Sequence, residues 1–405
     1  MARLGDICTF QSGGTPSKTV PAYYQGNIPW ITTVSLTGGR ISNEAAIEYI
    51  TDQAIRESAA KIVPQNSIMV GTRVGVGKVA INTVPMSTSQ DIISLLNIDE
   101  STWDKDFLCK FIAAKSAYLN SKARGATIKG IKIETLSSLD LPEITLEEQK
   151  HISRVIDEVL QLVKYRKDQL NELDQLVKSR FIELFGDPVE NPKGLPVKAL
   201  KRLSVLITNG NTPKGGSENY VPNGILFIRS QNVWRNRIDL HDVAYIDEKT
   251  HRSLRKSSLK HKDILITKTG RINTENSSLG RAALYLGEDD SANINGHVYL
   301  VRLDGSVVPE YVISILTSEA YRKYIRKVCV GGIDKRQINL DQVEEFPIIL
   351  PPVKDQTEFA AFVEQTDKLK FAVQNAVYLQ ITLILNLVNH PWEHWASVSN
   401  KGVKL

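Results

Sequence analysis

An internal repeat dominates this sequence, and it limits the chain to a fold that is built twice. The segment Gly14-Thr15-Pro16 has a counterpart in Asn211-Thr212-Pro213, with the two prolines 197 positions apart. The apolar segments 28–31 and 225–228 keep the same separation, and each is followed by a polar patch. Because order and spacing recur together, the sequence predicts two similar globular regions rather than one large domain.

The repeat continues to the end of each copy. Leu141-Pro142 corresponds to Phe346-Pro347, and Glu148-Gln149 corresponds to Asp355-Gln356. The separation grows because the second copy carries a longer loop, residues 270–278. Insertions that fall in one loop are typical of a variable surface.

Each copy ends in a long helical segment. Residues 146–185 contain no proline or glycine, and a second such segment runs from about residue 355 to 389. In both, apolar residues recur in steps of three and four, which is typical of a coiled-coil seam. The expected seam comprises Ile152, Ile156, Val159, Val163, Leu170, Leu173, Val177 and Leu184 in the first helix, and Phe362, Thr366, Leu369, Val373, Ala376, Gln380, Leu383 and Leu387 in the second. We expect the two helices to pair antiparallel, because neither buries its stripe alone, although each could instead pack on its own globular region.

The globular regions contain short β-rich runs separated by helical stretches. The expected strands are 67–70, 78–81, 92–98, 225–228, 263–266, 282–286 and 298–303, and the expected helices are 104–122 and 309–327. We therefore expect an α+β fold with mostly antiparallel or mixed sheets. The expected organisation is a globular domain at 1–144, a helix at 145–186, a second globular domain at 187–352, a second helix at 353–390 and a tail at 391–405.

Composition favours a folded cytoplasmic protein. The hydrophobic fraction of 42% and the charged fraction of 23% argue against long disordered segments. Three widely separated cysteines without a Cys-x-x-Cys pair favour a reducing compartment, and no run of about 18 apolar residues suggests a membrane span. The formal net charge of +5 admits a polyanionic partner without requiring one.

Signatures of catalysis are not visible in the sequence. The glycine-rich segment 71–78 resembles a phosphate-binding loop, but it has Thr72 where that motif needs glycine and Val79 where it needs a hydroxyl. We therefore interpret the segment as a turn between two strands. No tetrapeptide for amino-group methylation, no nucleophile elbow and no zinc-protease helix occurs. An enzyme with an unfamiliar active site remains an alternative.

Polar and basic residues do recur in corresponding loops of the two copies. Arg229, Gln231 and Asn232 together offer the side chains that form bidentate contacts with guanine and with adenine. A charged, solvated face is the alternative interpretation of the basic residues. The candidate DNA-contacting residues are Thr15, Lys18, Thr32, Thr33, Ser35, Arg73, Lys78, Gln90, Arg124, Lys129 and Lys132 in the first copy, and Thr212, Lys214, Arg229, Gln231, Asn232, Lys268, Arg271, Asn273, His297, Lys335 and Arg336 in the second.

Several short motifs, taken in order, make the chain resemble the specificity (S) subunit of type I restriction-modification enzymes. They are Leu4-Gly5-Asp6-Ile7, Gly13-Gly14-Thr15-Pro16, Ile28-Pro29-Trp30, Leu141-Pro142, Glu147-Glu148-Gln149 and Ser179-Arg180-Phe181. The resemblance implies two target-recognition domains, each of which reads half of a split site in double-stranded DNA. It also implies two helices that set the spacing and dock two methyltransferase subunits, together with restriction/translocase subunits.

The resemblance further implies a non-catalytic chain that binds no cofactor itself. S-adenosylmethionine, ATP and Mg²⁺ are then expected on the partner subunits, and no membrane is involved. Two alternatives remain open at this point: a methyltransferase-nuclease fragment, and a coiled-coil scaffold without a DNA function.

Overall fold

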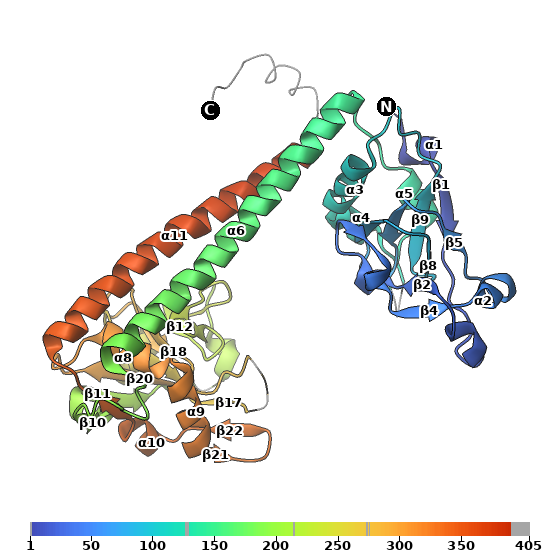
Figure 1. Ribbon diagram of the computed structural model, residues 1–405. Helices are drawn as coiled ribbons and strands as arrows, with labels where there is room; N and C mark the ends of the chain where they lie inside the picture. The colour runs from blue at the N-terminus through green and yellow to red at the C-terminus, as the bar shows by residue number, and fades with distance from the viewer. Residues whose placement is uncertain (1, 126–128, 214, 273, 275, 390–405) are drawn as a thin grey trace. The chain divides into compact units, whose positions relative to one another are not determined.

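The computed structural model describes residues 2–125, 129–213, 215–272, 274 and 276–389. The chain divides into two compact units. Unit 1 comprises residues 1–167 and 375–405, and unit 2 comprises residues 168–374. Both long helices cross the boundary, so each unit contains a globular part and a portion of both helices (Figure 1).

Unit 1 contains two mixed sheets. The larger sheet has the order β1-β9-β6-β7-β3, in which only the β7–β3 pair is parallel, and the smaller sheet has the order β4-β2-β8-β5, in which only β2–β8 is parallel. The strands are β1 (Thr9–Ser12), β2 (Ile28–Ile31), β3 (Arg40–Ile41), β4 (Glu48–Ile50), β5 (Ile62–Val63), β6 (Ile68–Gly71), β7 (Val79–Asn82), β8 (Met86–Thr88) and β9 (Ile92–Leu96). The short helices are α1 (Leu4–Ile7), α2 (Asp52–Glu57), α3 (Lys105–Ala114), α4 (Ser116–Lys122) and α5 (Ile133–Ser137).

Unit 2 repeats this arrangement with the orders β11-β20-β16-β18 and β15-β12-β19, and it adds the small sheets β10-β23, β13-β14 and β17-β22-β21. Its strands are β10 (Val197–Ala199), β11 (Ser204–Asn209), β12 (Ile225–Ile228), β13 (Val233–Trp234), β14 (Arg237–Ile238), β15 (Ala244–Ile246), β16 (Ile264–Thr267), β17 (Thr269–Arg271), β18 (Ala282–Leu284), β19 (Ala292–Ile294), β20 (Val298–Leu303), β21 (Val330–Gly331), β22 (Lys335–Gln337) and β23 (Pro347–Ile349). Its short helices are α7 (Glu248–Ser253), α8 (Pro309–Leu316), α9 (Glu319–Val328) and α10 (Leu340–Glu344).

The fold predicted from the sequence is confirmed. Strands β11, β20, β16 and β18 take the places of β1, β9, β6 and β7, and the parallel pair β12–β19 takes the place of β2–β8. Each of the seven expected strand ranges overlaps an observed strand, and three of the strands end one residue later than expected. The expected helices 104–122 and 309–327 are wrong in one respect, because each is two helices. The second break falls where the Ser318 side chain accepts a hydrogen bond from the Tyr321 amide and so begins a new helix.

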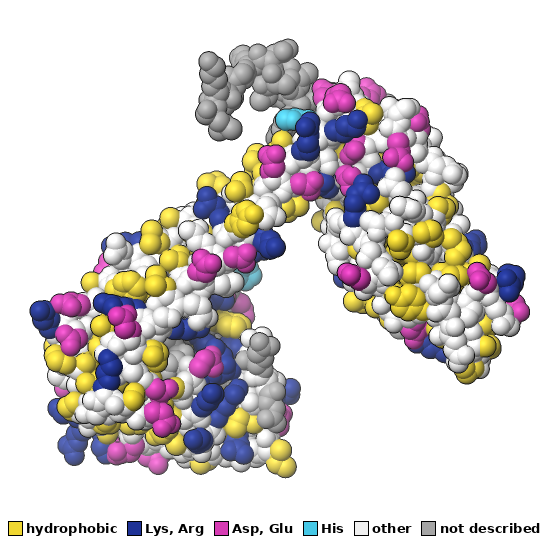
Figure 2. All heavy atoms as spheres, viewed as in Figure 1, with side chains coloured by type: hydrophobic (Ala, Val, Ile, Leu, Met, Phe, Trp, Pro, Cys, Tyr) yellow, Lys and Arg dark blue, Asp and Glu magenta, His cyan; other side chains and the backbone are white. Residues whose placement is uncertain are grey.

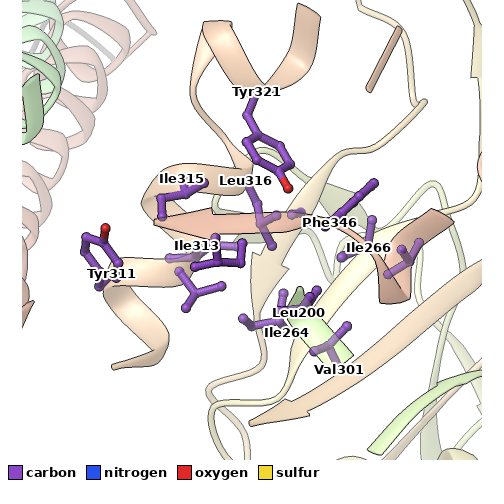
Figure 3. Packing of buried hydrophobic residues seen from close by; sticks show 14 of the residues in the cluster. Leu200, Ile264, Ile266, Val301, Tyr311, Ile313, Ile315, Leu316, Tyr321 and Phe346 are labelled. Atoms are coloured by element: carbon purple, nitrogen blue, oxygen red, sulfur yellow. The ribbon is translucent and has the colours of Figure 1, made fainter. Parts of the chain in front are cut away.

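The central strand of each larger sheet is buried on both faces. In unit 2, Ile264 and Ile266 of β16 belong to one apolar cluster, and Leu265 between them belongs to another. Alternate side chains of a strand point to opposite faces, which explains why three consecutive residues of the strand are apolar. Figure 3 shows the first of these clusters, where strand residues meet side chains of α8 and α9 such as Tyr311 and Tyr321. In unit 1, β6 divides its residues between two clusters in the same way.

The two long helices are α6 (Leu146–Phe185) and α11 (Val353–Asn389). Both begin with a buried glutamine that ties the helix to the globular part of its unit. The Gln149 side chain accepts a hydrogen bond from the Asp104 amide at 2.9 Å, and the Gln356 side chain accepts one from the Val308 amide at 3.0 Å. The recurrence of Glu148-Gln149 as Asp355-Gln356 therefore has a structural cause.

Within unit 2 the two helices pair antiparallel, as the sequence predicts. Near the end of α6, Phe181 packs on Phe359 near the start of α11, with ring centroids 5.5 Å apart. Further from both of these ends, Lys370 forms an ion pair with Asp174 at 2.7 Å. Because the sequence number rises along one helix as it falls along the other, the chain directions are opposite.

The expected seam of α11 is partly wrong. Leu369 and Leu383 are 54% and 47% exposed, whereas Thr366 and Val373 are buried. The Thr366 hydroxyl donates to the Phe362 carbonyl at 2.9 Å, so this polar residue is satisfied within the helix. The Leu387 side chain and the tail from residue 390 lie outside the described residues.

Candidate nucleic-acid interface

Five connecting segments of unit 1 meet through main-chain hydrogen bonds at the ends of its strands. They are residues 13–18, 31–35, 71–78, 87–92 and the described residues 124–125 and 129–132. The amide-to-carbonyl bonds that join them are Gly13 to Ile92 (3.1 Å), Ser89 to Ile31 (2.9 Å), Thr72 to Asp91 (2.8 Å) and Ile131 to Thr72 (2.8 Å). All candidate residues of the first copy lie on these segments, so the structure brings them together.

Unit 2 forms the same four bonds between the corresponding residues. They are Gly210 to Val298 (3.1 Å), Asn295 to Ile228 (3.0 Å), Lys268 to His297 (2.9 Å) and Ile338 to Lys268 (2.9 Å). We call the bonded segments of either unit its loop face. The described candidate residues of the second copy lie on the loop face of unit 2. Lys214 and Asn273 lie outside the described residues.

A glycine after the first strand allows the loops to approach closely in both units. A Cβ atom on Gly13 would lie 2.2 Å from the Ser89 carbonyl oxygen, and one on Gly210 would lie 2.0 Å from the Ile294 carbonyl oxygen. Such distances leave no room for any other residue without a shift of the backbone. This steric requirement explains why the glycine precedes Thr-Pro at the same position of the repeat.

The glycine-rich segment 71–78 connects β6 and β7 within the loop face of unit 1. Gly75 and Gly77 have positive φ angles of 78° and 81°. The Gly77 amide donates to the Gly71 carbonyl at 2.9 Å, which closes the turn. The segment is therefore the strand-to-strand turn that the sequence predicts, and it places Arg73 and Lys78 in exposed positions.

In unit 1, several polar side chains of the loop face are exposed and partly paired with each other. The Thr15 hydroxyl donates to the Gln90 side chain. Arg73 lies 3.7 Å from Asp91 and Lys18 lies 3.5 Å from Glu48, and both cations are more than half exposed. Such exposed pairs contribute little to stability, so these cations can exchange partners at small cost.

A turn follows β2 in unit 1 and β12 in unit 2. At one position of this turn, the side chain forms hydrogen bonds that hold the turn together. The Ser35 hydroxyl donates to the Ala45 carbonyl at 2.7 Å. At the corresponding position, the Asn232 side chain accepts from the Arg229 amide at 2.9 Å and donates to the Asp239 and Asp242 carbonyls at 3.0 Å each. Both residues are buried, as is Thr33. In this structure the Ser35 and Asn232 side chains therefore hold the turn, and Thr33 is buried beside them, so the DNA contacts expected of these three residues stay a prediction.

The neighbouring position of the same turn is exposed in both units. Val34 is 72% exposed, and Gln231 occupies the equivalent exposed place in unit 2. The sequence analysis did not select Val34, because an exposed apolar residue carries no signal in a polar patch. Thr32 and Arg229, which begin the turn, are half-buried.

Asp242 holds the two potential base-reading residues of unit 2. The Arg229 guanidinium donates to the Asp242 carbonyl at 2.6 Å and lies 3.3 Å from its carboxylate, and the Gln231 amide donates to that carboxylate at 2.7 Å. Arg229 also lies over the Tyr220 ring at 5.8 Å. These contacts fix two flexible side chains before any ligand arrives. The sequence analysis missed Asp242 because it lies outside the recurring segments.

The longer loop of the second copy adds a strand to the loop face of unit 2. In unit 1, residues 124 and 130 form a single bridge. In unit 2 the corresponding hairpin β21–β22 gains β17, which sets Arg271 opposite Lys335 and Gly270 opposite Arg336. Lys and Arg side chains gather on the visible part of unit 2 that carries α9, β17 and β22 (Figures 1 and 2). Arg271 is partly balanced by Asp334 at 3.4 Å.

Lys268 lies at the centre of this loop face. Its ammonium group is 5.9 Å from the centroid of the Tyr299 ring. The Tyr299 hydroxyl donates to the Ile338 carbonyl at 2.9 Å, and burial raises the pKa of Tyr299 to about 12. Tyr299 therefore stays neutral at physiological pH, and it supports Lys268 without neutralising its charge.

The architecture defines a tandem-repeat protein with two mixed α/β units and two long helices. Residues 1–175 match the type I restriction modification DNA specificity domain. The chain is 25% identical over 381 residues to the MjaIX specificity subunit of Methanocaldococcus jannaschii, covering 89% of this chain and 85% of that protein. It is also 25% identical to the EcoKI specificity subunit of Escherichia coli K12, covering 96% of this chain and 86% of that one.

Solved structures agree on the fold. The S subunit of a type I restriction-modification system from M. genitalium superposes with a TM-score of 0.52 at 14% identity, covering 95% of this chain and 94% of the other. A second solved chain comes from a structure described as the basis of complex assembly and conformational transition of the type I R-M system. It superposes with a TM-score of 0.61 at 15% identity, covering 96% of this chain and 96% of the other. The first 175 residues thus match the domain of type I restriction-modification DNA specificity proteins, and most of the chain is similar to named specificity (S) subunits of these enzymes.

None of the described helices has the length and apolar character that a membrane span requires. No group of three or more His, Cys, Asp or Glu residues in the described part of the chain is arranged to hold a metal ion.

Proposed function

We propose that this chain is the DNA-recognition subunit of its complex and that each unit reads one half of a bipartite duplex site. The observation that carries the proposal is the pair of loop faces. Their main-chain hydrogen bonds correspond one by one, whereas their exposed side chains differ. Two readers of different sequences need this combination of a constant scaffold and variable side chains.

The side chains at equivalent positions suggest different chemistry for the two half-sites. Gln231 carries an amide that suits the major-groove edge of adenine, whereas Val34 carries methyl groups that suit the methyl group of thymine. The basic residues that surround each turn suit phosphates, which position the protein on DNA without reading its sequence. We therefore assign base reading to the turns after β2 and β12, and backbone contacts to the surrounding cations.

Partner subunits are proposed to dock on the long helices. Large apolar side chains are exposed along both helices, visible as yellow spheres in Figure 2. They are Leu160, Leu162, Tyr165, Leu176 and Ile182 on α6, and Leu369, Phe371, Tyr378, Leu379, Ile381 and Leu383 on α11. Apolar side chains left exposed along a helix pair suit burial against protein partners. We propose that these partners are two methyltransferase subunits and restriction/translocase subunits, which carry S-adenosylmethionine, ATP and Mg²⁺.

Mapping of adenine methylation in the host genome tests the proposal. We expect one split sequence motif to be methylated in cells that contain the chain and its partner subunits, and to lose methylation when only this chain is removed. A motif that persists without the chain would contradict the assignment. Purified chain should also bind a duplex with this motif more tightly than a scrambled duplex.

A further inference from the structure

A pocket rich in arginine lies beside the loop face of unit 2. It encloses about 530 Å³ and is formed by the β13–β14 hairpin, the segment before β18 and the start of α9. Four arginines, one tryptophan and one glutamate supply its main side chains: Arg235, Arg237, Arg281, Arg322, Trp234 and Glu319. Four guanidinium groups and one carboxylate leave a formal excess of three positive charges.

The pocket lining holds more guanidinium groups than carboxylates. Glu319 forms an ion pair with Arg235 at 2.9 Å, with both side chains well exposed. Burial, together with the positive charge of Arg235, lowers the pKa of Arg281. Like charges that crowd at a partly buried site favour an added anion, because the anion relieves their repulsion.

Neutral groups hold Arg281 in place. Its guanidinium lies 4.0 Å from the centroid of the Trp234 ring, and it donates to the Ser277 carbonyl at 3.1 Å and to the Asn276 carbonyl. Arg237 lies over the same ring at 5.4 Å. Aromatic rings and carbonyl groups orient a guanidinium without cancelling its charge, so these arginines remain able to attract an anion.

The pocket is continuous with the loop face. Trp234 follows the turn 229–232 after one residue, and the Arg281 amide donates to the Thr267 hydroxyl at 2.9 Å, next to Lys268. Its Asn276 and Ser277 belong to the inserted loop that begins with β17. An anion that extends along the loop face, as a DNA backbone does, would therefore reach the pocket.

Unit 1 has different residues at the equivalent positions. Thr37 and Gly38 take the places of Trp234 and Arg235, and Lys78 takes the place of Arg281. Arg40, which corresponds to Arg237, is held by Asp106 at 2.6 Å. The arginine-rich pocket is therefore a property of the second unit rather than of the repeat.

We propose that this pocket binds a phosphate group of the duplex DNA backbone next to the second half-site. The proposal rests on the proposed function, because it assumes that the loop face of unit 2 meets DNA. A phosphodiester oxygen pair matches the fork of a guanidinium, and DNA presents such groups whatever its sequence. The contact would add affinity without adding specificity.

The test compares variants of the full chain by fluorescence anisotropy with two duplexes, one with the recognised motif and one scrambled, over a range of salt concentrations. Arg235→Gln combined with Arg237→Gln should weaken binding to both duplexes by about tenfold at 0.1 M salt. The slope of log affinity against log salt should fall by about one, the value for one lost phosphate contact. Glu319→Gln should strengthen binding to both duplexes a few-fold, because it removes the competing carboxylate.

Lys323→Gln is the matched control, because Lys323 is the exposed neighbour of Arg322 on α9 and does not line the pocket. If this variant weakened DNA binding as much as the arginine variant, the proposal would be overturned, because the effect would then come from the general positive charge of the surface and not from the pocket. Calorimetry with inorganic phosphate distinguishes the source of the anion. The assignment to DNA would be overturned if phosphate binding depended on Arg235 and Arg237 while the arginine variant left the slope of log DNA affinity against log salt unchanged. If the wild-type chain binds no DNA, the proposed function fails as well, whereas normal specific binding by the arginine variants overturns only this inference.

Discussion

The two loop faces have the same main chain and different side chains. Both place a glycine against a neighbouring carbonyl, both join their segments with four equivalent bonds, and both bury the last residue of the turn, Ser35 or Asn232. They differ at the exposed position before it, Val34 or Gln231, and in the inserted strand β17. The comparison separates residues that maintain the fold of the loop face from exposed residues that can vary and so determine which ligand binds.

The largest expected effect comes from exchange of one whole globular part. Replacement of residues 1–145 by the equivalent part of a similar named specificity subunit should change one half of the methylated motif and leave the other half unchanged. The reason is that each loop face is built from segments of a single unit. Methylation sequencing gives the result directly. A change in both halves would show that the units do not read DNA independently.

The buried glutamines test the scaffold that the units share. Gln149→Leu should destabilise unit 1 by about 2–3 kcal/mol, because it leaves the Asp104 amide and the Thr102 and Ile144 carbonyls without their partner. Gln356→Leu removes two such bonds in unit 2 and should cost somewhat less. Urea denaturation followed by pulse proteolysis measures both.

The exposed glutamines of the same helices provide matched controls for this experiment. Gln161→Leu on α6 and Gln365→Leu on α11 should change stability by no more than about 0.5 kcal/mol. Equal losses in the buried and exposed variants would mean that the buried amides do not anchor the helices.

The exposed turn position tests the difference between the units. Gln231→Ala should reduce discrimination in the second half-site by about 1–3 kcal/mol and leave the first unchanged, and Val34→Ala should do the reverse with a smaller magnitude. Arg229→Ala should likewise relax the second half-site. Competition binding with duplexes that carry single base changes measures the effect. Uniform weakening on every sequence would reassign these residues to phosphate contacts.

Alkaline pH should destabilise unit 2 through its buried tyrosines, with no effect at neutral pH. Burial raises the pKa of Tyr299 from 10.0 to about 12, and it also raises the pKa of Tyr311. Stability is then complete below pH 10 and is lost as the pH rises toward 12, because the unfolded chain gives up these protons first. Urea midpoints of unit 2 at pH 8 and pH 11 should differ less in Tyr299→Phe than in wild type. An identical difference would exclude Tyr299 as the cause.

Sequence reasoning succeeded where a pattern is repeated locally. The alternation of strands, the absence of helix breakers over residues 146–185 and the paired loops all follow from periodicity and spacing. It failed where neighbours distant in sequence decide the outcome. The sequence did not reveal that the Asn232 side chain donates to carbonyl groups seven and ten residues later, so its expected contact with a base stays a prediction. The seam of α11 was misplaced because Lys370, with an apolar stem and an ion pair, replaces Leu369.

The arginine-rich pocket shows a second reason for such failures. Its residues come from three stretches, 234–237, 276–281 and 319–322, and none of these stretches is distinctive by itself. Only the packing of α9 beside the β13–β14 hairpin turns scattered arginines into one cluster. The same limitation applies to Asp242, which has meaning only after Arg229 and Gln231 are seen to meet on it.

The main-chain bonds of the loop faces have a consequence for evolution. Amide and carbonyl groups are the same in almost every residue, so the exposed turn positions can mutate without disturbing the bonds beneath them. Gly13 and Gly210 are the opposite case, because any side chain there collides with backbone. Selection can therefore explore new preferences at one turn while folding is preserved and the other turn is untouched. A duplicated chain of this kind can change the binding preference of one unit while the other unit keeps its own.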